Sequence, residues 1–163
     1  MPIARIERAD RFFAASGAVI RHGGTRAYHA EGADYVQMPP FETFRDAESS
    51  AATLAHEVTH WTKHEKRLAR DVGRVRHGDE GYAKEELVAE LGAAFLAADL
   101  ELAPEVREDH AAYIGSWLKA LRDDKRLIFS AAAHAQRAAD YLHGLQPQAA
   151  IDAESASGEE RAA

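Results

Sequence analysis

The sequence contains no cysteine among its 163 residues. This absence excludes a disulfide framework, a zinc site with thiolate ligands and catalysis by a thiol. The sequence also lacks a long apolar run that could span a membrane, and no apolar segment follows the N-terminus as in a secretory signal. We therefore expect a cytoplasmic protein with no membrane insertion.

Basic residues are in the minority. Lys and Arg total 20 against 27 Asp and Glu, so the formal net charge is −7. This balance argues against a broad nucleic-acid surface, which would concentrate positive charge. Arg5, Arg8 and Arg11 form a local exception, for which we expect a solvated helix face. The length predicts one domain at residues 1–146, followed by a disordered tail of Ala, Ser, Gly and acidic residues at 147–163.

Apolar periodicity separates a β-like region from several helical segments. Helices are predicted at 3–15, from a cap at Asp46, Ser49 or Ser50 to about Arg70, and at 84–100, 104–121 and 125–142, with Gly144 as the final stop. Short strands are predicted at 18–20, 27–29 and 34–38. We therefore expect an α+β fold in which a small β-sheet packs on a bundle of four to five helices.

The sequence His56-Glu57-Val58-Thr59-His60 is the most informative motif. Histidines four positions apart share one face of a helix, so both imidazoles can bind one Zn²⁺. Glu57 can serve as the base for a metal-activated water. Catalytic zinc also needs a third protein ligand and an open position. The motif therefore predicts metal-assisted hydrolysis, most often of peptide bonds.

The third ligand must be a His, Asp or Glu, because the sequence offers no cysteine. Glu86 and Glu90 share a face of the helix predicted at 84–100. One carboxylate can bind the metal while the other accepts a hydrogen bond from a ligand histidine. The spacing alone allows either assignment. Gly92 would let this helix approach the histidine helix closely, and Glu85 is expected to point away into solvent.

Together these motifs resemble the glutamate-ligand zincins, and the resemblance implies Glu86 as the metal ligand and Glu90 as the residue that orients a histidine. A closer resemblance is to the C-terminal zincin-like domain of ArdC-type antirestriction proteins. It is carried by residues 54–62 and 82–95, and it covers about residues 15–145. It implies a peptidase-like module found on mobile elements such as plasmids and phages.

Other residues are weaker candidates. Four side chains are candidates to stabilise an oxyanion: Tyr82, His110, Tyr113 and His134. We expect a substrate peptide to pair with an edge strand formed by Tyr35, Val36, Gln37 and Met38. His64 continues the histidine series and as a fourth ligand would make the zinc structural, but we expect it beyond the metal.

The function predicted from the sequence is hydrolysis of a protein or peptide substrate by one Zn²⁺ ion, in an antirestriction or mobile-element context. Two alternatives remain. One is a non-catalytic zinc-bound module that binds a protein partner such as a restriction enzyme. The other is a DNA-associated domain, for which the three N-terminal arginines are the support.

Overall fold

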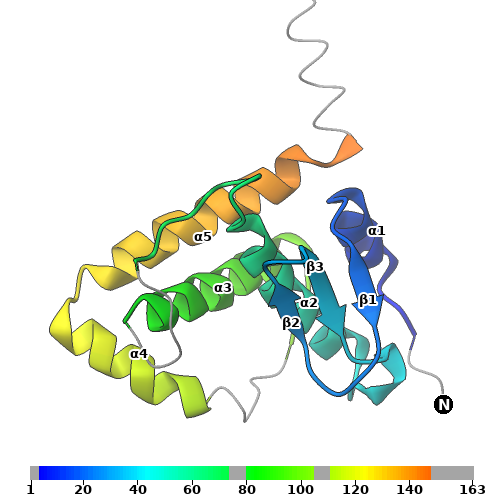
Figure 1. The fold of residues 1–163 in the computed structure, drawn as a ribbon. Helices are drawn as coiled ribbons and strands as arrows, with labels where there is room; N and C mark the ends of the chain where they lie inside the picture. Colours follow the sequence, from blue (N-terminus) through cyan, green and yellow to red (C-terminus); the bar gives the residue numbers. More distant parts are fainter. Residues whose placement is uncertain (1–3, 74–79, 105–110, 148–163) are drawn as a thin grey trace, which may run out of the picture.

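The structure is a computed structural model that describes residues 4–73, 80–104 and 111–147. Within these residues, five α-helices and a three-stranded sheet confirm the predicted α+β class (Figure 1). Beyond residue 147, the predicted tail lies outside the described part of the chain. The elements are α1 (Glu7–Ala15), β1 (Ile20–His22), β2 (Tyr28–Ala30), β3 (Tyr35–Met38), the 3-10 turn η1 (Phe41–Thr43), α2 (Ala47–Thr62), α3 (Glu80–Asp99), α4 (Ala111–Asp123) and α5 (Leu127–Gly144).

Helix α2 is the centre of the arrangement. It contacts β2 and β3 on one side and α3 on the other, while α3 also packs against α4 and α5 (Figure 1). The motif residues on α2 therefore lie between the sheet and the helical part of the molecule. Side chains of α2 that face α3 therefore lie in the interior of the protein.

The sheet has the order β1-β3-β2. Strand β1 is parallel to β3, with Ile20 opposite Val36, and β2 is antiparallel to β3, with His29 opposite Val36. The prediction that Tyr35, Val36, Gln37 and Met38 form an edge strand is therefore wrong. The neighbouring strands occupy both sides of β3, so its backbone groups are not free to pair with a substrate.

The main core joins the sheet to four helices. Val36 and Met38 alternate into it from β3, as expected for a strand with one buried face. Its other large members come from α1, α2, α3 and α5, among them Phe13, Val58, Trp61, Leu96 and Leu142. The alanine-rich character of α5 allows close packing on α3, and Ala131, Ala135 and Ala138 are fully buried.

Helix α2 begins where the sequence predicts and ends earlier. The Asp46 carboxylate accepts a hydrogen bond from the Ser49 backbone N–H (2.7 Å), which is an N-cap interaction. The helix ends at Thr62, before the predicted end near Arg70, because the following segment folds back. The Leu68 N–H donates to the Thr62 carbonyl (3.0 Å), and Arg67 Nε donates to the Trp61 carbonyl (2.6 Å).

Other helix ends differ from the prediction as well. Helix α1 begins at Glu7 rather than Ile3, α3 begins at Glu80 rather than Lys84, and Gly144 is the last residue of α5 rather than the residue beyond it. The chain continues α5 in a right-handed turn, with φ −83° and ψ −5° at Leu145, so no left-handed glycine is needed.

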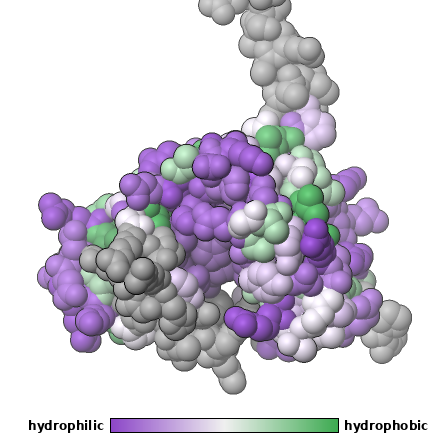
Figure 2. All heavy atoms as spheres, viewed as in Figure 1, coloured by the Kyte–Doolittle hydropathy of each residue, from purple (hydrophilic) through white to green (hydrophobic). Residues whose placement is uncertain are grey.

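The surface shown in Figure 2 is covered mainly by hydrophilic residues, with apolar residues scattered among them. Among the described helices, none is long and apolar enough to cross a membrane.

Candidate metal centre

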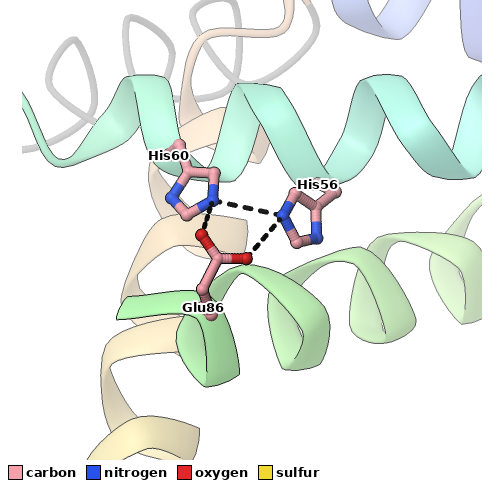
Figure 3. Close-up of side chains that lie close together, drawn as sticks. All are labelled: His56, His60 and Glu86. Atoms are coloured by element: carbon pink, nitrogen blue, oxygen red, sulfur yellow. Dashed lines mark hydrogen bonds and ion pairs between the residues drawn. The ribbon is translucent and has the colours of Figure 1, made fainter. Parts of the chain in front are cut away.

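The structure brings His56 and His60 of α2 together with Glu86 of α3 (Figure 3). The two Nε2 atoms lie 3.1 Å apart. One Glu86 oxygen is 3.3 Å from His60 Nε2, and the other is 3.4 Å from His56 Nε2. In a tetrahedral zinc site with bonds of about 2.0–2.1 Å, ligand atoms lie about 3.3–3.4 Å apart. The donor set therefore fits one small divalent cation.

The group of converging ligand atoms in the described residues has three members. Three protein ligands leave a coordination position for water or substrate, which is the arrangement of catalytic rather than structural zinc. His64 lies beyond the end of α2, and its Nδ1 accepts a hydrogen bond from the Lys66 N–H (3.1 Å). The early end of α2 thus removes His64 from the helical face that His56 and His60 share.

Glu90 contacts the far side of the His56 ring. Its Oε1 atom lies 3.0 Å from His56 Nδ1, while Nε2 of the same ring faces Glu86. A carboxylate at Nδ1 holds the proton there and leaves the Nε2 lone pair for a metal. Of the two acids that the spacing allowed, the structure places Glu86 among the converging ligand atoms and Glu90 behind a histidine.

Glu85 is buried, so the expectation that it points into solvent is wrong. Its side chain is 6% exposed, and its Oε1 lies 3.0 Å from His60 Nδ1. Arg70 forms a two-point ion pair with the same carboxylate: Nε donates to Oε2 (2.9 Å) and Nη2 donates to Oε1 (2.7 Å). Each histidine thus has its own carboxylate at Nδ1.

Burial and charge together set the protonation of the site. Burial alone would lower the pKa of His60, but hydrogen bonds to Glu85 and Glu86 outweigh it and raise that pKa to about 10. The pKa of His56 is raised too, because hydrogen bonds to Glu86 and Glu90 outweigh its burial. Against the opposing effect of burial, Arg70 and His60 lower the pKa of Glu85 to about 2, and the two histidines lower that of Glu86. Without a metal, these shifts favour protonated imidazoles, and the hydrogen bond between the two Nε2 atoms needs one proton between them, which a metal must displace.

Glycine at position 92 sets how closely α3 approaches α2. A Cβ atom at Gly92 would lie 2.6 Å from Thr59 Cγ2 and 2.7 Å from Thr59 Oγ1. Such distances are too short for carbon, so only glycine fits without a shift of the helices. This contact lies two residues beyond Glu90 on α3, and it agrees with the close approach expected from the sequence.

The remaining predicted site residues are placed as follows. Glu57 lies on α2 and is 8% exposed. Tyr82 is half-buried on α3, one turn before Glu86 on the same helix face. His134 lies on α5 beside Arg137, with its Nδ1 2.9 Å from Arg137 Nη2. His110 and the side chain of Tyr113 lie outside the described residues, so both stay predictions.

Two of the N-terminal arginines are engaged within the fold. Arg8 Nη2 donates to the Glu101 carbonyl beyond the end of α3 (2.8 Å). Arg5 lies over the Phe41 ring, 4.4 Å from its centroid, and pairs with Asp10 (3.2 Å). These contacts give Arg5 and Arg8 structural roles, which weakens the support for a DNA-associated domain.

The site residues that the sequence did not reveal are Glu85 and Arg70. The signal available for them was the pair of adjacent acids Glu85-Glu86, next to a helix that must bury two histidines. The face of α3 that contacts α2 is wider than the face shared by Glu86 and Glu90, because Glu85 also contacts His60.

Comparison with known proteins gives a consistent result. The model of a family described as zincin-like metallopeptidase matches residues 7–134. The chain is 51% identical over 145 residues to the uncharacterized protein y4eC of Sinorhizobium fredii, covering 89% of this chain and 47% of y4eC. It is 44% identical over 138 residues to DNA primase TraC of Escherichia coli, covering 84% of this chain and 13% of TraC.

Solved structures of one protein are similar along most of the chain. The Mn(II)-bound structure of the antirestriction protein ArdC from plasmid R388 aligns with a TM-score of 0.78 at 48% identity, covering 90% of this chain and 55% of ArdC. The metal-free structure of ArdC aligns with a TM-score of 0.79, also at 48% identity, covering 91% and 53%. The chain thus spans about half the length of ArdC and of y4eC, and less of TraC.

Proposed function

Because the chain belongs to the zincin-like metallopeptidase family, we propose that it hydrolyses peptide bonds with one bound Zn²⁺ ion. The observation that carries this proposal is the donor set: the two Nε2 atoms lie 3.1 Å apart, and each faces its own oxygen of Glu86 at 3.3 or 3.4 Å, close to the ligand separations of a tetrahedral site. The ArdC structure is Mn(II)-bound, which supports a divalent ion as the metal of this chain. For this chain we favour zinc, because two imidazoles and one carboxylate suit it well.

In the proposed mechanism, His56, His60 and Glu86 would hold the metal, which would supply Lewis-acid chemistry toward a scissile carbonyl and lower the pKa of a water molecule. Glu57 accepts the proton of that water and then delivers a proton to the leaving amine. Glu90 and Glu85 hold His56 and His60 by their Nδ1 atoms, so that each Nε2 faces the metal position. Tyr82, one turn before Glu86, remains our candidate to stabilise the oxyanion.

The substrate is proposed to pair with β2. In the described sheet, β2 is an outer strand, whereas β3 has a partner on each side. Strand β2 also contacts α2. Burial lowers the pKa of His29 in β2, and the charge of His60 also lowers it. A peptide added along Tyr28–Ala30 would therefore run beside the metal position, held by main-chain hydrogen bonds.

For the cellular context, we propose a role in antirestriction or in the transfer of a mobile element. The support is the similarity to the antirestriction protein ArdC of plasmid R388 and to DNA primase TraC. The proposed substrate or partner is then a protein of a restriction-modification system.

The metal-free and Mn(II)-bound ArdC structures align equally well with this chain, which favours a metal that serves chemistry rather than folding.

The decisive experiment compares the wild-type chain with Glu57→Gln. Each protein is stripped of metal, reloaded with Zn²⁺ and incubated with a peptide library, and cleavage is read by mass spectrometry. We expect Glu57→Gln to bind zinc like the wild type and to lose about 10²–10⁴-fold in cleavage rate, since only the base is removed. His56→Ala is the control that should lose the metal as well.

A zinc-loaded wild-type chain that cleaves no peptide would contradict this proposal. The non-catalytic alternative then has its own test, in which antirestriction is scored in cells that carry wild-type or Glu57→Gln protein. Full protection by Glu57→Gln would show that partner binding, not hydrolysis, is the biological mechanism.

A further inference from the structure

We infer that Arg70 is a positioning residue for the metal centre, acting through Glu85 on the His60 imidazole. The inference rests on the proposed function, because it takes His60 as a metal ligand. The Arg70 side chain is 1% exposed. Besides its two bonds to Glu85, its Nη1 donates to Thr62 Oγ1 (3.0 Å) and its Nη2 donates to the Thr59 carbonyl (3.0 Å). One buried cation therefore joins the last turn of α2 to α3.

The link to His60 passes through one oxygen atom. Glu85 Oε1 accepts from Arg70 Nη2 (2.7 Å) and lies 3.0 Å from His60 Nδ1. The carboxylate keeps the proton of His60 on Nδ1, and Arg70 keeps the buried carboxylate charged and in place. Removal of Arg70 would leave Glu85 as a buried charge without its cation, which is strongly unfavourable. The ring of His60 would then lose its fixed orientation.

The two histidines differ in how they are held. Glu90, which holds His56, has a side chain that is 20% exposed, so water can solvate its charge. Glu85 is 6% exposed and depends on Arg70. The structure thus predicts that the His60 side of the site is the one that responds to a change at Arg70.

Arg67 provides a matched control. It lies in the same segment after α2, its side chain is 8% exposed, and it also folds back on the helix. Its guanidinium stacks on the Trp61 ring, 3.9 Å from the centroid, and its Nη1 donates to Asp34 Oδ2 (3.0 Å). Arg67 therefore joins the segment to the sheet, whereas Arg70 joins it to α3 and the metal centre.

The experiment uses the full chain with Arg70→Met, Glu85→Gln, the double variant and Arg67→Met. Zinc affinity is measured by competition with a chromophoric chelator, and the His60 ring nitrogens are followed by NMR in the metal-free protein. We expect Arg70→Met and Glu85→Gln each to weaken zinc binding about 10- to 100-fold. The double variant should bind no more weakly than the weaker single variant, because both act through one contact. Arg67→Met should keep wild-type affinity and unchanged His60 signals.

The inference is overturned if Arg70→Met keeps both wild-type zinc affinity and unchanged His60 signals, or if Arg67→Met loses as much affinity as Arg70→Met. If the loss of zinc affinity in the double variant equals the product of the two single losses, Arg70 acts independently of Glu85, and the inference is wrong. If Arg70→Met does not fold by circular dichroism, Arg70→Lys replaces it; lysine keeps the charge but not the two-point geometry, so an intermediate loss is expected. If the wild-type chain binds zinc but cleaves no peptide, only the proposed function is overturned. If the chain binds no zinc, the NMR signals of His60 still test the role of Arg70.

Discussion

Helix α3 packs most extensively against α2 and α5, and these two interfaces have opposite chemistry. Toward α5, the contact is made by small and branched apolar residues, including Leu87, Val88, Ala131 and Ala135. Toward α2, three carboxylates of α3 face two histidines and an arginine: Glu85, Glu86 and Glu90 against His56, His60 and Arg70. One helix thus stabilises the fold with one face and supplies the candidate metal ligand with the other.

The difference shows how a small domain can hold a charged site in its interior. Buried apolar surface stabilises the fold by roughly 25 cal/mol per Å². Buried carboxylates have a desolvation cost, which is offset only where each is paired and hydrogen-bonded. The α3–α5 contact should therefore control stability, and the α2–α3 contact should control metal affinity. The following substitutions test that separation.

The largest effect on stability is expected on the apolar side. Leu87 follows the candidate ligand Glu86 in the sequence, but its buried side chain belongs to the apolar cluster that faces α5. Leu87→Ala removes that side chain. The free energy of unfolding should fall by about 2–5 kcal/mol, because the substitution leaves a cavity. Urea unfolding measures this change, and chelator competition on the folded protein should show unchanged zinc affinity. If Leu87→Ala loses zinc affinity but not stability, the proposed separation between the α3–α5 and α2–α3 contacts is wrong.

Gly92→Ala tests the polar side. The new Cβ would collide with Thr59, so α3 must move away from α2. We expect a loss of about 1–3 kcal/mol in unfolding free energy from overpacking, and weaker zinc binding because Glu86 and Glu90 move with α3. Both quantities are measured as above.

Gly115→Ala is the matched control for Gly92→Ala. Gly115 lies in α4 with open space around its Cβ position. Because alanine favours a helix over glycine by about 1 kcal/mol, this variant should be more stable than the wild type and should bind zinc unchanged. Equal behaviour of the two alanine variants would exclude close helix packing as the reason for Gly92.

Zinc binding should depend strongly on pH. The pKa of His60 is raised to about 10 in the metal-free protein, and that of His56 is raised as well, so zinc must displace protons below these values. The apparent affinity for zinc should therefore fall about tenfold for each unit by which the pH is lowered, for each proton displaced. Calorimetry in two buffers with different ionisation enthalpies counts the protons released. No release near pH 7 would show that the imidazoles are already neutral.

The same pKa shift has a consequence for the metal-free fold. The stabilising contribution of protonated His60 is fully present below its ordinary pKa of 6.5, and it is lost as the pH rises through about 10. The urea midpoint of the metal-free protein should therefore decrease over this window. His60→Gln should flatten that decrease, because it removes the titrating group.

The smallest effect is expected at the start of α2. Asp46→Ala removes the carboxylate that accepts from the Ser49 N–H, which should lower the unfolding free energy by about 1 kcal/mol. Zinc affinity should not change, because the cap lies away from both α2–α3 and α3–α5 contacts. Asp46→Asn keeps an acceptor and should recover most of the loss.

Local patterns explain why much of the site was predictable. His56 and His60 are four residues apart, so their shared face follows from helix geometry alone. Glu86 and Glu90 share a face of α3 for the same reason. The Asp46 cap was one of three candidates in the sequence, and it also depends on contacts within a few residues.

Features that depend on distant contacts were not predictable in the same way. The end of α2 at Thr62 depends on Arg67 and Arg70 folding back on its carbonyls. The central place of β3 depends on a parallel pairing with β1, which joins residues 20–22 to residues 36–38 across an intervening strand. Strand period alone says which side chains share a face, but not which strand lies at the edge.

The sequence by itself determined that His56, Glu57 and His60 lie on one helix and that Glu86 and Glu90 share a face of another, because spacing on a helix is a local property. Tertiary structure decided which acid meets the Nε2 atoms of the histidines, that Glu85 is buried against His60, and that Arg70 balances its charge. The physical reason is that a side chain's partner across an interface depends on how two helices are docked, and here Gly92 and Thr59 set that docking.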